Sequence, residues 1–509
     1  MPDYFETELK LKVLQPGDNV LQAFQNSEYI GQLVPENAWT TTRMEAWYYD
    51  TAEQSLQKAG IAYRVRREGD NWVATVKANG SSDGGLHQRE EWNLASPDCE
   101  PRPELFAELP IGPKLLDTIG DQPLQPLFAT VFERYAAEVS FEAARVELAV
   151  DEGKILAGEL SEPIREVELE LKEGQPVALL RLGAAIAREI PLAPEPKSKY
   201  FRALLLAGLA EQQPKPVVDL PIQTALADGL SLLMSVAVGK LFSTYQAFLA
   251  HSDEPRHAYQ MRVKLRRLRS LLVFAKPCIP LEDFQTWKQM LAEWGRVFGP
   301  LRDLDVLAVE WEELCNSPYI TFDSRPWLGD TISKRRLAQL EQVSQTINQG
   351  RLSAELLELW AWSEGHPWQP GEYPSTIGAF ARWRIGGWLA ALLDAGKTAN
   401  WENDQELHAL RLRLKRIRYT LAAMPFYTDR RSIKLLTEIK AMQDLFGTLN
   451  DRAVAGRLLT TLARGATRAV YRDIGILSGW QGRGEQSARS QLQRQWRNFR
   501  QAAKRWLDA

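Results

Sequence analysis

Two stretches in which every second residue is charged restrict the fold of this chain more than any other feature. Residues 5–13, FETELKLKV, carry charged side chains at most even positions and apolar ones at most odd positions. Residues 166–172, EVELELK, show the same alternation. A β-strand sends successive side chains to opposite faces, so each stretch has one charged and one apolar face. The charged faces lie in water if the sheet is open, and they line an interior if the sheet closes.

The first part of the chain, up to about residue 200, consists mainly of short alternating runs separated by turn-forming clusters at residues 68–71 and 81–85. Between the two acidic stretches, further charged residues share strand faces: Arg64, Arg66, Lys77, Arg89, Glu91, Arg134, Glu147 and Asp151. If the sheet closes, these side chains converge in one wet interior. Arginine and lysine bind phosphate oxygens, and clustered carboxylates hold hard divalent cations. The pattern therefore predicts a site for a polyphosphate together with Mg²⁺ or Mn²⁺.

The second part of the chain contains an internal repeat. Residues 259–269 align with residues 408–418 at an offset of 149, and residues 298–303 align with residues 446–451 at an offset of 148. Apolar residues recur here at helical spacing, so the repeat predicts two similar helical bundles. We therefore expect an α+β multidomain protein, with a β-rich domain at 1–210, a linker rich in Pro and Gln at 211–221, and an all-α domain at 222–509 whose repeats cover about 222–375 and 376–509.

Each repeat carries a basic stripe on one helix. Arg262, Arg266 and Arg269 are spaced i, i+4, i+7, and the same spacing holds for Arg411, Lys415 and Arg418. A charged stripe on a bundle helix commonly faces water. Pseudo-symmetry between the repeats also allows the two stripes to come together in a dense basic cleft. Both interpretations stay open at this point.

The charge balance and the cysteines limit the possible partners. Sixty-two Lys and Arg residues face 65 Asp and Glu residues, which gives a formal charge of −3 and argues against nucleic-acid binding through overall charge. An anion site must therefore be local. Three scattered cysteines support neither a disulfide framework nor a zinc site and fit a reducing cytoplasm. The N-terminus has no apolar signal core, and Asp228 interrupts the longest apolar stretch, 226–239, so we expect no membrane association.

The ordered set of charged motifs resembles the CYTH, or triphosphate tunnel metalloenzyme, superfamily. The resemblance begins with Glu6-x-Glu8-x-Lys10, covers about residues 1 to 205, and continues in the family's order through Tyr49-Asp50-Thr51, Arg64-x-Arg66, Lys77, Arg89-x-Glu91, Phe132-Glu133-Arg134, Glu147 to Asp151, Glu166 to Glu170, and Ser198-Lys199 to Arg202. A single ExExK motif is weak, because any amphipathic strand can produce it. The resemblance implies an antiparallel eight-stranded β tunnel with flanking helices that hydrolyses an inorganic or organic triphosphate with a divalent metal.

The resemblance also implies roles for individual residues. The catalytic residues are Glu6, Glu8 and Lys10. The metal ligands for Mg²⁺ or Mn²⁺ are Glu6, Glu8, Glu168 and Glu170, with Asp151 and Glu166 as helpers. The substrate-binding residues are Lys10, Arg64, Arg66, Lys77, Arg89, Arg134 and Lys199. One metal ion would orient the phosphates, and a second would activate the water that attacks the terminal phosphorus. No histidine is needed, and we interpret His87 as a surface residue beside a Gly-rich turn.

The repeated helices resemble the CHAD domain, a helical domain often appended to CYTH domains and associated with inorganic polyphosphate. The motifs that carry the resemblance are His408-x-x-Arg411, Lys415 to Tyr419, Gln443 to Gly447, and Arg302 to Asp305. Tyr259 stands where the family has its first histidine, and His257 lies on another helical face. The implied polyphosphate-binding residues are Arg262, Arg266, Arg269, His408, Arg411, Lys415 and Arg418. For His408, a hydrogen bond to a carboxylate and a direct phosphate contact are both open.

The preferred hypothesis is a cytoplasmic, metal-dependent inorganic triphosphatase, resembling bacterial CYTH-CHAD enzymes, whose helical domain binds polyphosphate. It splits triphosphate into diphosphate and phosphate, and it has no sequence-specific nucleic-acid partner. One alternative is a non-catalytic polyphosphate-binding scaffold. Another is a tunnel enzyme that acts on thiamine triphosphate or a nucleotide, including an adenylate cyclase.

Overall fold

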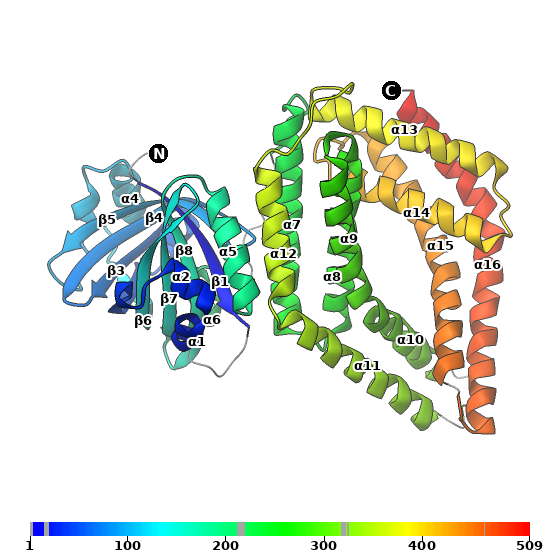
Figure 1. Cartoon of the computed structure of the whole chain (residues 1–509), viewed down its shortest axis with the longest axis horizontal. Coiled ribbons are helices and arrows are strands. Elements are labelled where there is room, and N and C mark those ends of the chain that lie inside the picture. Colours follow the sequence, from blue (N-terminus) through cyan, green and yellow to red (C-terminus); the bar gives the residue numbers. More distant parts are fainter. Residues whose placement is uncertain are drawn as a thin grey trace. The chain divides into compact units, whose positions relative to one another are not determined.

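The computed structural model describes residues 4–14, 20–210, 219–316, 322, 325–462 and 464–508. The chain divides into two compact units, each described by itself below (Figure 1). The first unit comprises Met1–Val217, Val238–Gln246 and Ile347–Gly365, and the second comprises Val218–Ala237, Ala247–Thr346 and His366–Ala509. Residues 211–218 of the predicted linker lie outside the described residues.

The first unit contains a closed antiparallel barrel, as the sequence predicts. Within the described residues, nine strands form one sheet in the order β5-β4-β3-β2-β6-β7-β8-β1-β9, and β5 also pairs with β1, so that β1 to β8 close into a barrel. The strands are β1 Phe5–Val13, β2 Thr40–Asp50, β3 Ala62–Glu68, β4 Asn71–Asp83, β5 Leu86–Ser96, β6 Gln125–Phe141, β7 Ala144–Ala157, β8 Leu160–Glu173 and β9 Leu192–Pro194. The predicted turn clusters fall at the β3–β4 and β4–β5 hairpins.

Apolar side chains on the outer face of the barrel explain why the charged ones point inward. Leu9 and Leu11 of β1 have no exposed surface. The helix α5, Val177–Glu189, packs so closely on β1 that a Cβ added at Gly183 would lie 2.5 Å from Cδ2 of Leu9. Burial of this outer face supplies the hydrophobic stabilisation, so the alternate residues face the lumen. The other short helices of this unit are α1 Val20–Asn26, α2 Glu28–Leu33, α3 Ser55–Lys58, α4 Gly112–Ile119 and α6 Lys199–Leu206.

The helix α6 fills the apolar end of the barrel interior. Its Ala203 and Leu204 belong to one buried cluster with Met44, Tyr48 and Phe132 of the barrel wall. The Ser198 hydroxyl caps the helix by accepting a hydrogen bond from the amide of Phe201. This cap and the buried cluster place the first residues of α6, Lys199 and Tyr200, at the charged part of the lumen.

Two helical segments from later in the chain complete the first unit. One is Val238–Gln246, part of α7 (Leu226–Ala250), and the other is Ile347–Gly365, which contains α12 (Arg351–Glu364). The second segment packs on α5, since Arg188 forms an ion pair with Glu358. α7 is also the one described helix long and apolar enough to cross a membrane, but 56% of its apolar window is buried, as in a core helix of a soluble protein.

The second unit is all helical among its described residues. Its helices are α8 Pro255–Ala275, α9 Leu281–Val297, α10 Gly299–Cys315, α11 Arg325–Ile347, α13 Ile377–Thr398, α14 Asp404–Leu421, α15 Arg430–Leu462 and α16 Arg468–Leu507, together with the first part of α7. The boundary between the two units falls within α7, after Ala237, and at the end of α11, after Thr346.

The two repeats have corresponding helices, but they differ in whether the helix that follows the basic stripe is continuous. α8 corresponds to α14, and both carry the predicted basic stripes. In the first repeat a break at Phe298 separates α9 from α10, whereas in the second repeat α15 runs unbroken through the aligned residues. Pro300 in the first repeat aligns with Thr448 in the second. Proline has no amide hydrogen and clashes with the preceding turn, so it permits a helix start but not a continuous helix.

Candidate active site

A cavity of about 420 Å³ opens inside the barrel. Eight basic side chains and seven carboxylates line it. They include all the residues predicted from the sequence to hold substrate or metal: Glu6, Glu8, Lys10, Arg64, Arg66, Lys77, Arg89, Arg134, Glu168, Glu170 and Lys199. The two predicted helpers, Asp151 and Glu166, are fully buried beside this lining.

The pairing of β1 with β8 brings the two acidic stretches together. Glu8 lies opposite Glu170, and Lys10 lies opposite Glu168. Directly opposed residues of an antiparallel pair share a face, so their side chains enter the same lumen. β5 supplies the other neighbour of β1, with Arg89 opposite Glu6. The sequence expectation that charged residues far apart in the chain meet in one interior is therefore confirmed.

Glu6 is held between two cations. Lys77 Nζ lies 2.9 Å from Glu6 Oε2, and Arg89 Nε lies 2.7 Å from the same oxygen. Burial alone would raise the pKa of Glu6, but Lys77 and Arg89 lower it well below its ordinary value. Lys77 also pairs with Glu91 at 2.7 Å, and Arg89 with Glu8. These contacts keep Glu6 ionised and fix both basic side chains on the cavity wall.

A second charged cluster is buried beside the cavity. Asp151, Glu166 and Glu168 approach closely enough for one oxygen from each to hold a metal ion. Cations already occupy this position, because Lys199 Nζ lies 2.7 Å from Asp151 and 2.9 Å from Glu168 and also pairs with Glu166. Arg134 pairs with Asp151 at 2.7 Å and with Glu168. In this structure the trio therefore neutralises and orients basic side chains.

Glu168 contacts three of the predicted phosphate-binding cations. Lys10, Arg134 and Lys199 all donate to its carboxylate. Burial would raise the pKa of Glu168, but the three cations, Lys10 first, lower it well below its ordinary value. Glu168 therefore stays ionised and holds the cations in place.

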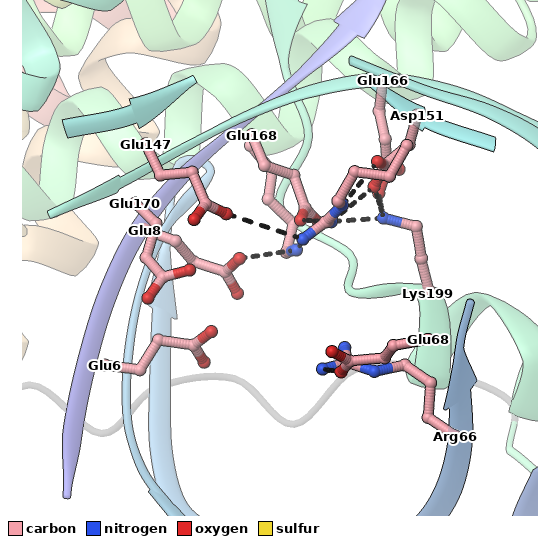
Figure 2. Close-up of polar contacts among 12 residues, drawn as sticks. Glu6, Glu8, Arg66, Glu68, Glu147, Asp151, Glu166, Glu168, Glu170 and Lys199 are labelled. Atoms are coloured by element: carbon pink, nitrogen blue, oxygen red, sulfur yellow. Dashed lines mark hydrogen bonds and ion pairs between the residues drawn. The ribbon is translucent and has the colours of Figure 1, made fainter. Parts of the chain in front are cut away.

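Four further carboxylates lie along one side of the cavity, and each is also paired with a basic side chain. Figure 2 shows Glu6, Glu8, Glu170 and Glu147 along one side, facing the lumen. Glu147 and Glu170 share Lys172, at 3.3 Å and 2.7 Å. The pKa of Glu170 is raised by burial, with further contributions from the charges of Glu6 and Glu147. A hard cation bound by these oxygens would relieve that repulsion, so the donor set fits Mg²⁺ or Mn²⁺.

Glu147 as a possible ligand was not among the predicted metal residues. Its presence on one strand face with Asp151 was visible in the sequence, but nothing there placed it beside Glu170. The β7–β8 register sets Glu147 opposite Glu170. Glu147 was not predicted as a ligand because the register of β7 and β8 cannot be read from the sequence.

Two arginines face the cavity with unused hydrogen-bond donors. Among the described atoms, the Nε groups of Arg64 and Arg66 are buried and have no hydrogen-bond partner. Arg64 lies 3.6 Å from Glu91, and Arg66 pairs with Glu68. Burial and the charge of Arg64 lower the pKa of Arg66 to about 10. A bound anion would satisfy the donors and offset the repulsion, as expected of a phosphate-binding pair.

His87 is not at the surface, and that sequence interpretation is wrong. Its side chain is 3% exposed and its Nε2 lies 3.2 Å from the carbonyl oxygen of Glu195. The closed barrel causes the difference, because His87 lies opposite Glu8 in the β1–β5 ladder. Burial, more than the nearby charges, lowers the pKa of His87 to about 4, so the ring is neutral near pH 7.

The basic stripes of the second unit have mixed surroundings. Arg262 donates to the carbonyl of Gly299 at 2.7 Å and lies 3.6 Å from Asp303. Arg418 donates to Gln443 at 2.6 Å. His408 is exposed, and burial, Arg411 and Lys415 lower its pKa. His408 pairs with no carboxylate among the described residues, and a direct contact with phosphate stays a prediction.

An arginine cluster around Trp388 was not predicted from the sequence. Arg384 and Arg416 lie 5.0 Å and 5.5 Å from the centroid of the Trp388 ring. The charges of Arg413 and Arg269 act on Arg416, and that of Arg266 acts on Arg269, so these five arginines form one cluster. None of the five forms an ion pair with a carboxylate among the described residues. Burial and the neighbouring arginines Arg413 and Arg269 lower the pKa of Arg416. Only the packing of α13 beside α14 brings Arg384 into this cluster.

At the position of the missing histidine, Tyr259 contacts an arginine. The guanidinium of Arg302 lies 4.7 Å from the centroid of the Tyr259 ring. Tyr259 thus holds Arg302 beside the α8 stripe.

The closed barrel and its charged lumen define a protein of the tunnel class. The CYTH domain family matches residues 5–202, and the CHAD domain family matches residues 237–460. The chain therefore carries a CYTH domain followed by a CHAD domain, as the sequence motifs indicate.

Similar proteins are known in bacteria and plants. An inorganic triphosphatase of Haemophilus influenzae is 34% identical over 166 residues, which cover 32% of this chain and 45% of that protein. This chain thus matches less than half the length of that relative. An uncharacterized protein of Mycobacterium tuberculosis is 25% identical over 501 residues, 92% of this chain and 90% of that protein. The CHAD domain structure of Ricinus communis covers 56% of this chain and 94% of its own, with 23% identity and a TM-score of 0.47.

Proposed function

We propose that the barrel hydrolyses inorganic triphosphate to diphosphate and phosphate with Mg²⁺ or Mn²⁺. The observation that carries this proposal is the lining of one closed cavity by eight basic side chains and seven carboxylates. Similarity to the inorganic triphosphatase of Haemophilus influenzae supports it. The near balance of charges also explains the need for metal, because the anionic triphosphate enters a lumen that its own carboxylates largely neutralise.

The roles proposed for the residues follow from their positions. Lys10, Arg64, Arg66, Lys77, Arg89, Arg134 and Lys199 hold the phosphate oxygens. Glu6, Glu8, Glu168 and Glu170 hold the metal, with Glu147 as an added ligand and Glu168 also orienting cations. When bound there, Mg²⁺ or Mn²⁺ supplies charge neutralisation at the phosphoryl oxygens and lowers the pKa of water. The basic side chains align the terminal phosphoryl group and stabilise its charge, so that water, and no side chain, is the nucleophile.

A substrate panel tests this proposal. Phosphate release is measured from inorganic triphosphate, ATP and thiamine triphosphate, each with Mg²⁺, Mn²⁺ or EDTA, and cyclic AMP formation is measured from ATP. We expect inorganic triphosphate to give the highest kcat/KM and EDTA to abolish turnover, because the lumen offers charge but little apolar surface. A preference for thiamine triphosphate or ATP, or cyclisation of ATP, would establish the nucleotide or thiamine alternative. No turnover of any of these substrates would contradict the proposal and leave the non-catalytic scaffold standing.

We further propose that the helical domain binds inorganic polyphosphate, and that the protein works in the cytoplasm. The first part is supported by the cluster of five arginines without carboxylate partners, of which Arg384 and Arg416 approach Trp388, and by the stripes. The stripe residues are Arg262, Arg266, Arg269, His408, Arg411, Lys415 and Arg418. Guanidinium groups approach Trp388, so the ring is a poor platform for stacking a base, which favours phosphate over nucleic acid. The three free cysteines fit a reducing compartment. We keep the division at residues 1–210 and 222–509 as the proposed boundary of the two activities.

Replacing Arg266 and Arg269 together by Ala is expected to weaken polyphosphate binding by about 100-fold. Each arginine belongs to a predicted stripe and to the Trp388 cluster, and a charge-assisted hydrogen bond contributes roughly tenfold in affinity. The measurement is fluorescence anisotropy of a labelled polyphosphate chain at several salt concentrations. The matched control is Arg296→Ala on α9, whose side chain is 72% exposed. Equal affinity of the double variant and the control would contradict this assignment.

A further inference from the structure

Lys10 lies where β1 changes its partner strand. β5 pairs with Phe5 to Leu9, and β9 pairs with Leu11 to Val13. Between these two ladders, the Lys10 amide donates to the carbonyl of Gly85 at 2.8 Å, and the Lys10 carbonyl accepts from the amide of Glu195 at 2.8 Å. On this side of β1, the backbone of Lys10 is therefore held by the tip of the β4–β5 hairpin and by the residues that follow β9.

The segment 238–246 and Trp360 contact the hairpin tip from outside the barrel. A Cβ added at Gly84 would lie 2.9 Å from Cδ2 of Phe242, 3.0 Å from Cα of Gly239 and 3.1 Å from Cζ3 of Trp360. Gly84 has a φ of +55°, which also favours glycine there. The neighbouring Gly85 is equally confined, since its Cβ would lie 2.9 Å from the carbonyl oxygen of Lys10. The hairpin tip therefore lies close against the helical segment at Gly84 and close against the backbone of Lys10 at Gly85.

The segment 238–246 also contacts the residues that hold the carbonyl of Lys10. Gln246 Nε2 donates to the carbonyl of Pro194 at 2.6 Å, and Pro194 precedes the Glu195 amide that bonds to Lys10. Phe242 and Tyr245 have no exposed surface, and Tyr245 donates to the carbonyl of Ile347 at 3.5 Å. Close-packed interiors transmit small displacements, so a shift of these side chains reaches both supports.

We propose that Phe242, Gln246 and Trp360 are positioning residues for Lys10. They act through Gly84 and Gly85 on one side of its peptide unit and through Pro194 and Glu195 on the other. The consequence for catalysis rests on the proposed function, in which the Lys10 ammonium holds phosphate. The tunnel thus depends on residues that lie well beyond the proposed boundary at residue 210.

Two glycines with similar φ angles provide a matched test in the full-length chain. Gly84→Ala introduces the collision with Phe242 and Gly239, whereas Gly69→Ala, at φ +59°, adds a Cβ with nothing within 4 Å. Gln246→Glu removes the donor to Pro194 with little change in shape, and Gln246→Lys keeps a donor. Hydrogen exchange is measured at the amides of Lys10 and Glu195, with thermal melting as the check on global stability.

We expect exchange at Lys10 and Glu195 to rise about tenfold or more in Gly84→Ala and Gln246→Glu, but not in Gly69→Ala. The kcat for triphosphate is expected to fall roughly tenfold in the first two variants and to recover in Gln246→Lys, because a displaced Lys10 loses its alignment. Equal exchange in Gly84→Ala and Gly69→Ala, or loosened amides with unchanged kcat, would overturn the inference. If the wild-type protein hydrolyses no triphosphate, the proposed function fails, and the exchange data alone decide whether these residues position Lys10.

Discussion

Glu8→Gln is expected to lower kcat for triphosphate hydrolysis by roughly 10³-fold. Glu8 is 2% exposed, pairs with Lys10 at 2.8 Å and with Arg89, and lies opposite Glu170. The substitution keeps the shape of the side chain but removes one negative charge from the proposed metal ligands and from the partner of Lys10. Loss of one preorganised electrostatic group commonly costs 10²- to 10³-fold in kcat, and Glu8 serves two such roles. Steady-state phosphate release with Mg²⁺ and with Mn²⁺ is the measurement.

Two comparisons make the Glu8→Gln result specific. The control is Glu138→Gln on β6, whose side chain is 61% exposed outside the cavity lining and whose variant should keep full activity. Polyphosphate binding by the Glu8→Gln variant should equal that of the wild type, since the proposed polyphosphate residues lie on other elements. Loss of both activities would show that the two sites are not independent, and retention of turnover would remove Glu8 from the proposed metal site.

Glu168→Ala is expected to lower the free energy of unfolding by about 3 kcal/mol at pH 7. Removing one partner of a buried ion pair leaves charges without compensation, which typically costs 3–5 kcal/mol. Here Lys10, Arg134 and Lys199 each keep at least one other carboxylate partner, so the lower end of that range applies. Urea denaturation, followed in the transition of the barrel, gives the measurement. The control is Glu162→Ala on the same strand, whose pair with Arg202 is partly exposed and contributes at most about 1 kcal/mol.

Glu168 is also expected to make the free energy of unfolding depend on pH. The pKa of Glu168 is lower in the folded chain than in the unfolded chain, so its contribution to stability is complete above the ordinary value of 4.5. It is lost as the pH falls from that value through the lower folded pKa. The stability difference between wild type and Glu168→Ala should therefore narrow below pH 4.5. A constant difference would mean that Glu168 acts only through packing, and equal stabilities at pH 7 would contradict its role in holding the cations.

Much of the barrel could be predicted because charged and apolar residues alternate along its strands. The charged even residues of β1 and the apolar Leu9 and Leu11 are separated by strand geometry alone, and the sequence places them without knowledge of any partner. Alternation does not decide whether the sheet is open or closed. The resemblance to the CYTH superfamily predicted that it closes. The helical repeat was equally visible, because the stripes of α8 and α14 recur at a constant offset.

The errors and omissions share one cause, which is pairing between elements distant in the sequence. His87 follows a Gly-rich turn, as surface residues often do, but the β1–β5 closure buries it opposite Glu8. Glu147 reaches the acidic side only through the β7–β8 register. Arg384 joins the arginines of α8 and α14 only because α13 packs beside them. The sequence around each of these residues does not indicate the contact that the residue makes.

The sequence by itself determined which side chains share a strand face or a helix stripe, because that depends only on the backbone geometry of one element. The tertiary structure alone decided which faces meet, and therefore which basic side chains pair with each carboxylate. Along the chain, Glu6 and Glu168 are both acidic residues of an alternating charged stretch. In the folded chain, Lys77 and Arg89 pair with Glu6. Lys199 and Arg134 pair with Glu168 instead. The physical reason is that charge compensation depends on distance in space, and the register of paired strands sets that distance.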